Sequence, residues 1–325
     1  MHRPAVMRLA FAAALAAAFT APAPTVIEYQ IPRNGAFPHD PAVGADGIVW
    51  YTDQATSHIG RFDPATGQFS DFKTPTEQSG PHGIIVAPDG GVWFTENAKG
   101  KIGRLDPATG SIKEYTLPPA ARDPHTPLWH DGKLWFTSQG ADLYGVLDPA
   151  TGVATLYAVR EGRARPYGLV AGRDGLWIAL FGTNSLGRID PANGTIRLFP
   201  IPDSTVRPRR LVVDAQGIVW FTDNVRGHLG RLDPKTGAVR LFPSPGGAGS
   251  GPYGIAIAPD GRIWYDEGNN NQIVTFDPQT QAMTTVAIPT PGATVRNMAV
   301  DSTRARLWLA LSGTGRIGRI DLGTK

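Results

Sequence analysis

The chain has 325 residues, of which 41% are hydrophobic and 18% are charged, so it has enough apolar material to fill a core. Because single cores usually stop growing at about 250–300 residues, two domains or a repeat architecture are expected. The formal net charge of +3 gives no indication of a nucleic-acid partner. The absence of cysteine excludes disulfides, thiolate chemistry and cysteine-ligated metals.

Residues 1–23 have the pattern of a secretory signal peptide. His2, Arg3 and Arg8 form a basic start, and 9–19 is an uncharged, alanine-rich run that is too short to span a bilayer. We therefore expect a signal peptide over 1–23 and one domain over 24–325. The mature protein is expected in the periplasm or outside the cell, as a monomer without a membrane span.

Two markers recur together along the rest of the chain. Tryptophans are spaced 42 to 44 residues apart, at Trp50, Trp93, Trp135, Trp177, Trp220, Trp264 and Trp308. Aspartates follow in step, the first six of them before a proline, at Asp63, Asp106, Asp148, Asp190, Asp233, Asp277 and Asp321. Periods of about 40–45 residues rich in short strands are typical of propeller blades. The sequence therefore predicts an all-β fold, a seven-bladed β-propeller whose tryptophans pack blade against blade.

The second repeat illustrates the four strands expected in each blade. Strands are predicted over 83–87, 92–95, 101–106 and 111–117, separated by turns rich in aspartate, proline and glycine. Proline presets φ, glycine tolerates positive φ, and aspartate can bond its own backbone, so these residues favour tight turns. The four strands of each repeat therefore form an antiparallel sheet.

The last repeat ends without room for a fourth strand, while the segment 26–32 resembles the fourth strands of other repeats, such as 113–118. We predict that residues 26–31 complete the seventh blade and close the ring.

Polar residues recur where each first strand begins. Because innermost strands line a propeller's channel, one residue per blade forms a ring at its mouth, at His39, His82, His125, Tyr167, Arg209, Tyr253 and Asn297. A second ring is expected three residues after each tryptophan, at Asp53, Glu96, Ser138, Leu180, Asp223, Glu267 and Leu311. In the second repeat, His82 and Glu96 lie on one hairpin, so their side chains are expected to converge.

Imidazoles beside carboxylates support two kinds of chemistry. They can bind a divalent cation, and a histidine near a carboxylate can act as a general acid or base near neutral pH. His82, His39 and His125 are therefore candidate catalytic residues. Candidate substrate-binding residues are Tyr167, Arg209, Tyr253, Asp53, Asp223 and Glu267. The alternative is that all of them are partly solvated polar residues filling the top of a narrow channel.

The segments 80–84, 92–97, 101–105 and 113–118 (GPHGI, VWFTEN, KIGRL and KEYTLP) resemble blades of the streptogramin B (virginiamycin B) lyases, and the resemblance covers residues 26–322. These lyases are similar seven-bladed propellers that use Mg²⁺ and a histidine to open a cyclic depsipeptide by eliminating its ester carboxylate. The resemblance implies a metal-dependent carbon–oxygen lyase with Mg²⁺, or alternatively Ca²⁺, held by Glu96 and His82. His39 or His125 would then transfer the proton.

Two other functions fit the same pattern. The first is a non-catalytic propeller that binds a peptide, glycan or protein across its polar face, as repeat scaffolds often do. The second is a lactonase-like, metal-dependent hydrolase, because related propellers hold Ca²⁺ in the channel with oxygen ligands. For an enzyme of either kind, the expected partner is a small molecule or peptide at the channel mouth.

Overall fold

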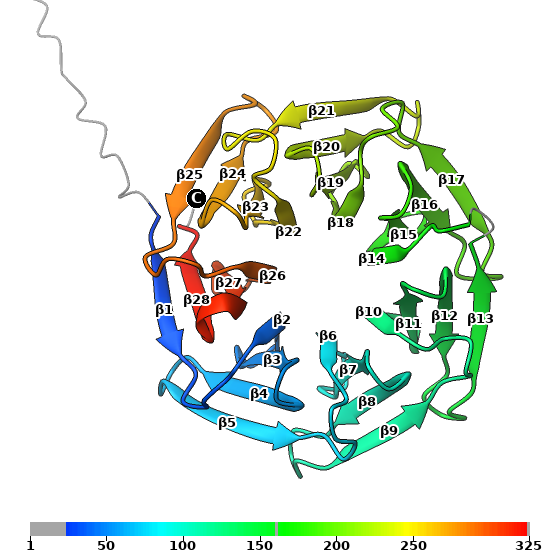
Figure 1. The fold of residues 1–325 in the computed structure, drawn as a ribbon, viewed down its shortest axis with the longest axis vertical. Helices are drawn as coiled ribbons and strands as arrows, with labels where there is room; N and C mark the ends of the chain where they lie inside the picture. Colours follow the sequence, from blue (N-terminus) through cyan, green and yellow to red (C-terminus); the bar gives the residue numbers. More distant parts are fainter. Residues whose placement is uncertain (1–23, 160–161, 324–325) are drawn as a thin grey trace, which may run out of the picture.

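The structure is a computed structural model that describes residues 24–159 and 162–323. Seven four-stranded antiparallel sheets surround one axis, which confirms the predicted seven-bladed propeller (Figure 1). The expected signal peptide, residues 1–23, lies outside the described residues. The only helix in the described ranges is a 3-10 turn, η1 (Ser312–Thr314), and no described helix is long and apolar enough to cross a membrane.

Six blades each use four consecutive strands, ordered from the axis outward. Blades 1 and 2 are formed by β2 (Pro38–Val43), β3 (Val49–Asp53), β4 (His58–Asp63), β5 (Gln68–Lys73), β6 (Pro81–Val86), β7 (Val92–Glu96), β8 (Lys101–Leu105) and β9 (Ile112–Thr116). Blades 3 and 4 are formed by β10 (Pro124–His130), β11 (Lys133–Ser138), β12 (Leu143–Leu147), β13 (Ala154–Ala158), β14 (Pro166–Gly172), β15 (Gly175–Leu180), β16 (Ser185–Ile189) and β17 (Ile196–Pro200). Blades 5 and 6 are formed by β18 (Pro208–Val213), β19 (Val219–Asp223), β20 (His228–Leu232), β21 (Val239–Pro243), β22 (Pro252–Ile257), β23 (Ile263–Glu267), β24 (Gln272–Phe276) and β25 (Met283–Ala287).

Blade 7 joins the two ends of the chain. Its strands are β26 (Val295–Asp301), β27 (Arg306–Leu311), β28 (Arg316–Asp321) and, outermost, β1 (Val26–Gln30). β1 pairs antiparallel with β28 from Val26 opposite Ile320 to Gln30 opposite Arg316, and in Figure 1 it lies along the outer side of that strand. The predicted closure by the N-terminal strand is therefore confirmed, because the two ends of the chain share one blade.

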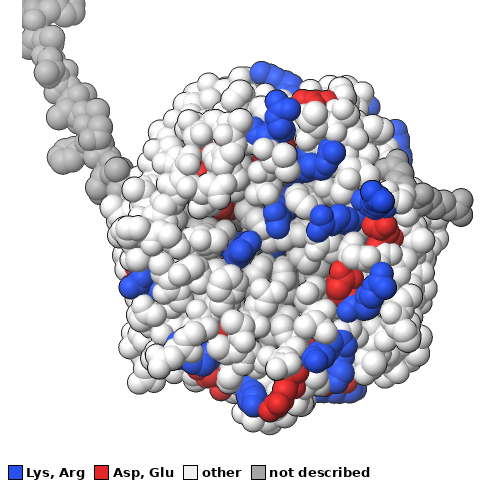
Figure 2. Space-filling model, viewed as in Figure 1, with Lys and Arg blue, Asp and Glu red and all other residues white. Residues whose placement is uncertain are grey.

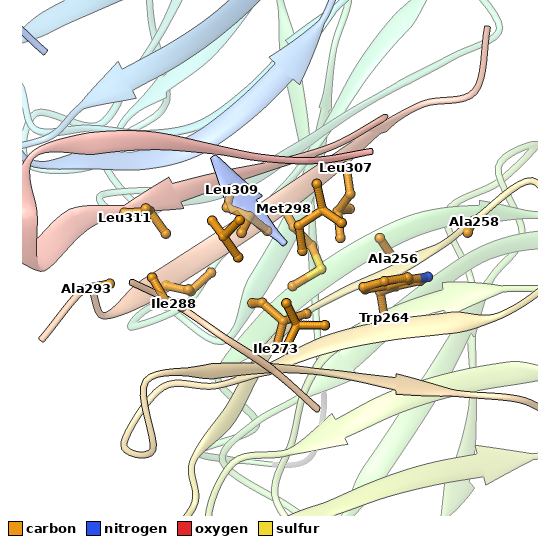
Figure 3. Close-up of a cluster of buried hydrophobic side chains, with 14 residues drawn as sticks. Ala256, Ala258, Trp264, Ile273, Ile288, Ala293, Met298, Leu307, Leu309 and Leu311 are labelled. Atoms are coloured by element: carbon orange, nitrogen blue, oxygen red, sulfur yellow. The ribbon is translucent and has the colours of Figure 1, made fainter. Parts of the chain in front are cut away.

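The repeated tryptophans fill the seven interfaces between blades. All seven are at most 3% exposed, and each lies in a hydrophobic cluster with apolar residues of the following blade. In Figure 3, Trp264 of blade 6 packs in one cluster with Leu307 and Leu309 of blade 7. Removing such an indole typically costs about 3–5 kcal/mol. The ring is therefore held by packing, and the tryptophans are not a ligand cage.

Glycines on the third strands make room for aromatic side chains from the second strands. A Cβ atom at Gly60 would come within 1.9 Å of the Tyr51 ring, and one at Gly103 within 2.1 Å of the Phe94 ring. These contacts explain the glycine in the repeated Ile-Gly-Arg triplets, and they keep the aromatic rings inside the blade interfaces.

Candidate functional site

The first residues of every innermost strand form a bulge that points one side chain toward the axis. In blade 1, Pro38 pairs with Asp53, but the next paired residue is Pro41, and the other six innermost strands have the same shift. Bulges of this kind re-aim side chains and are common next to functional sites. His39 and its equivalents lie in this segment, so they form the ring at the channel mouth.

The register of blade 7 corrects one member of this ring. Val295 pairs with Leu311 as Pro38 pairs with Asp53, and therefore Arg296, not Asn297, is equivalent to His39. Blade 7 has no proline to mark the start of the strand, and the sequence therefore predicted Asn297 at this position. The ring contains two arginines, Arg209 and Arg296, instead of one.

Threonines on the second strands fix the ring residues to the neighbouring blades. Thr52 Oγ1 accepts a hydrogen bond from the backbone N–H of Asp40 at 3.1 Å and donates to the His82 carbonyl at 2.7 Å. Similar bridges connect Thr95 to the carbonyl of His125 and Thr137 to that of Tyr167, both at 2.9 Å. Because these bridges tie each blade to the next, the ring residues are held by rigid strands.

The three histidines and a tyrosine form a continuous row of rings. Ring centroids are separated by 3.7 Å between His39 and His82, 3.8 Å between His82 and His125, and 3.9 Å between His125 and Tyr167. All four side chains are buried. Burial is the main cause that lowers the pKa of each of the three histidines below 6.5, and this effect is strongest for His82 and His125. The imidazoles are therefore neutral at neutral pH.

His39 is oriented by a buried carboxylate. Its Nδ1 lies 2.9 Å from Oδ1 of Asp40, and Asp40 receives the Arg210 guanidinium at 2.8 and 3.0 Å. Burial raises the pKa of Asp40, but the charge of Arg210 and the hydrogen bond with His39 outweigh it and bring the pKa far below its usual range. Asp40 is therefore an anion that holds the Nδ1–H tautomer of His39, which leaves Nε2 as a free base.

The opposite side of the ring combines tyrosines and arginines. The hydroxyls of Tyr167 and Tyr253 are hydrogen-bonded to each other across the channel. Arg209 donates to Tyr167 Oη at 3.2 Å and to Asn224 Oδ1 at 2.8 Å, and its guanidinium lies 4.2 Å from the centroid of Tyr253. The mouth thus places neutral bases on one side and cationic hydrogen-bond donors on the other.

The second predicted ring is buried, but its acids hold loops. Asp53 accepts hydrogen bonds from Arg33 and from the N–H of Phe37, and Asp223 Oδ1 accepts from the N–H of Arg207 at 3.1 Å. Glu267 accepts from Ser244 and from the N–H of Gly246. These contacts fasten the segments that lead into the innermost strands. The assignment of Asp53, Asp223 and Glu267 to substrate binding stays a prediction. Within residues 24–159 and 162–323, no hydrogen bond or ion pair joins these acids to the row of histidines.

Glu96 differs from the other acids of this ring. It is fully buried, and neither carboxylate oxygen has a hydrogen-bond partner among the described residues. Burial first, and then the charge of Glu114 on the outer strand β9, raise the pKa of Glu96 to about 7. Its polar neighbours are Ser79, Lys101 and Glu114. The predicted convergence of Glu96 with His82 therefore has no contact to support it.

Within the described ranges, the potential ligand atoms that cluster include those of His82 but not those of Glu96. Atoms of His39, Asp40 and His82 lie within 4.8 Å of one another. However, both oxygens of Asp40 accept hydrogen bonds from Arg210. The guanidinium therefore already balances the negative charge of this buried cluster. Mg²⁺ and Ca²⁺ prefer several oxygen ligands, often anionic. These residues therefore do not fit either ion.

Two residues of this arrangement, Asp40 and Arg210, were missed by the sequence analysis. They immediately follow the ring residues His39 and Arg209, and their contact joins positions 170 residues apart. The signal that could have identified them is composition: the same position is glycine in blades 2, 4 and 6, as in Gly83. A charged residue in place of a buried glycine requires a partner.

Comparisons with known proteins agree with this architecture. The family model described as the virginiamycin B lyase family matches residues 16–180 and 153–325. A search of curated proteins finds no match to the chain.

Three kinds of solved structure are similar to the chain. A streptogramin B lyase structure has 26% identity and a TM-score of 0.85, with 92% of this chain and 98% of that chain covered. Virginiamycin B lyase from Staphylococcus aureus has 25% identity and a TM-score of 0.86, with 93% of this chain and 100% of that chain covered. A catalytically inactive histidine-to-alanine variant of that enzyme with Quinupristin gives the same values. The extracellular domain of a hybrid two component system from B. thetaiotaomicron has 16% identity and a TM-score of 0.72, with 93% and 43% covered, and shares the fold alone.

Proposed function

The chain belongs to the virginiamycin B lyase family, and we propose that it is an exported carbon–oxygen lyase that opens cyclic esters, such as depsipeptide lactones, at the channel mouth. The observation that carries this proposal is the buried His39–Asp40 pair in a row of neutral imidazoles, opposite tyrosine and arginine side chains. Export rests on the signal-peptide pattern of residues 1–23.

The reaction needs a base near the carbon next to the ester-bearing carbon. Nε2 of His39 takes the proton from the α-carbon, the electron pair of that C–H bond forms the carbon–carbon double bond, and the bond from the β-carbon to the ester oxygen breaks. The ester oxygen leaves as part of a carboxylate, and the ring of the substrate opens without addition of water. Atoms and charge balance because the proton remains on His39 until solvent removes it.

The surrounding residues assist this step. Asp40 stabilises the imidazolium that forms on His39, because a buried anion 2.9 Å from Nδ1 favours the charged ring. The hydroxyls of Tyr167 and Tyr253 lie on the opposite side of the mouth and can donate to the negative charge that develops on oxygen. His82 and His125 complete the row against which the substrate packs, and His82 keeps His39 in place.

The mass of the product tests the proposal. A cyclic depsipeptide and simple lactones are incubated with the purified protein, and the products are analysed by mass spectrometry. We expect a ring-opened product with the mass of the substrate and a new carbon–carbon double bond, and at least a ~100-fold lower rate for His39→Ala. A product heavier by one water molecule would identify a lactonase-like hydrolase, and binding without turnover would identify a binding propeller. Either result contradicts the proposed lyase.

A further inference from the structure

Three guanidinium groups surround the ring of Tyr253 at the channel mouth. The Cζ atoms of Arg209, Arg210 and Arg296 lie 4.2, 5.3 and 5.8 Å from its centroid. Only Arg210 forms an ion pair, with Asp40, among the described residues. One carboxylate therefore balances only one of the three guanidinium charges, and two positive charges are left without an anion.

Arg209 and Arg296 carry these two charges. Arg209 donates only to neutral oxygens, those of Asn224 and Tyr167, and its Nε is buried without a partner. Nε of Arg296 is also buried without a partner within the described part of the chain. Both side chains are partly exposed, whereas the histidines and tyrosines of the ring are buried, so a ligand in solvent can reach the two arginines.

The basic character continues on the surrounding surface. Figure 2 shows Lys and Arg side chains near the middle of this face and, with fewer Asp and Glu side chains among them, over the neighbouring blades 4 and 5. Phe181 contacts two arginines, with the Cζ atoms of Arg165 and Arg209 at 5.2 and 4.7 Å from its centroid. Aromatic stacking holds the guanidinium planes in place while their N–H groups stay available for a ligand. A positive mouth of this kind attracts anions.

We propose that Arg209 and Arg296 form a carboxylate-binding site, and that the substrate is a cyclic ester that carries a free carboxylate. The inference rests on the proposed function, because it names the substrate class of the same site. Guanidinium groups match carboxylates with paired N–H donors, and charge-assisted hydrogen bonds of this kind are about twice as strong as neutral ones. The acid group binds beside Tyr253, which leaves the ester to face the row of histidines.

Calorimetric titration of citrate, with its neutral trimethyl ester as the uncharged control, tests this site without any turnover. We expect citrate to bind, its affinity to fall with added salt, and the trimethyl ester not to bind. Arg209→Gln and Arg296→Gln should each weaken citrate binding about 10-fold or more. Arg240→Gln, an exposed arginine on the outer strand β21, is the matched control and should leave it unchanged. Thermal unfolding of each variant checks that the fold is intact.

Three results would overturn the inference: equal binding of citrate and its trimethyl ester, citrate binding that survives both arginine substitutions, or tighter Arg209-dependent binding of inorganic phosphate than of citrate. Because the assay needs no reaction, failure of lyase activity and failure of carboxylate binding are separate outcomes. A protein that binds citrate through Arg209 but does not open lactones keeps this site and loses the proposed reaction.

Discussion

The two polar rings of this propeller come from equally regular sequence positions, but they do different work. Residues of the innermost strands, such as His39 and Tyr253, meet across the channel. Acids of the second strands, such as Asp53 and Asp223, hold the loops of their own blades. A repeated polar position therefore indicates a ring, but only the direction of its side chains decides whether that ring reaches a ligand.

The physical reason is the alternation of side chains along a strand. On β7, Thr95 and Glu96 are neighbours, so they point to opposite faces of the sheet. Thr95 bridges to the carbonyl of His125 in the next blade, and Glu96 consequently faces the other way, toward residues such as Ser79. A residue three positions after a repeated tryptophan has the same place on the second strand in every blade. This spacing does not say how far its side chain lies from the channel.

The largest expected effect is a loss of stability when an acid of the second ring is removed. Asp223→Ala removes the fully buried carboxylate that accepts hydrogen bonds from the backbone N–H groups of Arg207, Val225 and Arg226. Losing three charge-assisted hydrogen bonds should lower the free energy of unfolding by about 2–4 kcal/mol. Denaturant unfolding measures it, with Asp203→Ala at an exposed turn as the control. A loss no greater than that of the control would show that the second ring is not structural.

Asp266 gives the next largest effect, on the pH dependence of stability. It occupies the position of the bridging threonines, and burial first of all raises its pKa to about 7. The unfolded state ionises at lower pH than the folded state, so stability is fully present below about pH 4 and is lost as the pH rises toward 7. Asp266→Asn, which keeps an acceptor and adds a donor, should stabilise the protein by about 2 kcal/mol at pH 8 and leave it unchanged at pH 4. Equal effects at both pH values would contradict a buried neutral acid.

A smaller effect is expected in the pH profile of turnover. Burial lowers the pKa of His39 below 6.5, although Asp40 opposes this, while Arg210 and Arg296 add to it. The free base therefore persists down to pH 6.5, and kcat/KM should change less than about twofold between pH 8 and 6.5. Steady-state kinetics across this range provide the measurement. A tenfold fall by pH 6.5 would mean that another group is the base.

The smallest expected effect is that of metal removal. Because Arg210 occupies both oxygens of Asp40, turnover after dialysis against a chelator should stay within about twofold of the untreated rate. Activity assays before and after dialysis, with Mg²⁺ and Ca²⁺ added back, check this. Loss of activity that Mg²⁺ restores would reinstate the ligand set implied by the family resemblance.

Most of the fold could be predicted because its causes are local and repeated. The tryptophan spacing, the Asp-Pro turns and the strand-like segment 26–31 each specify one blade or its closure. The ring of His39, His82 and His125 also followed from this periodicity. What could not be predicted is which side chains meet across the axis, because the pairing of Asp40 with Arg210 depends on how blades 1 and 5 face each other. The single-residue shift at Arg296 likewise required the strand register.

The most direct test compares one member of each ring within the same hairpin. Kcat/KM is measured for His82→Ala, in the row of histidines, and for Glu96→Gln, on the second strand. The account predicts about a 100-fold loss for His82→Ala, because the base His39 loses the ring that keeps it in place. It predicts a change of less than about threefold for Glu96→Gln, with both variants folded. A loss in Glu96→Gln as large as that in His82→Ala would contradict it and place the working site on the second ring.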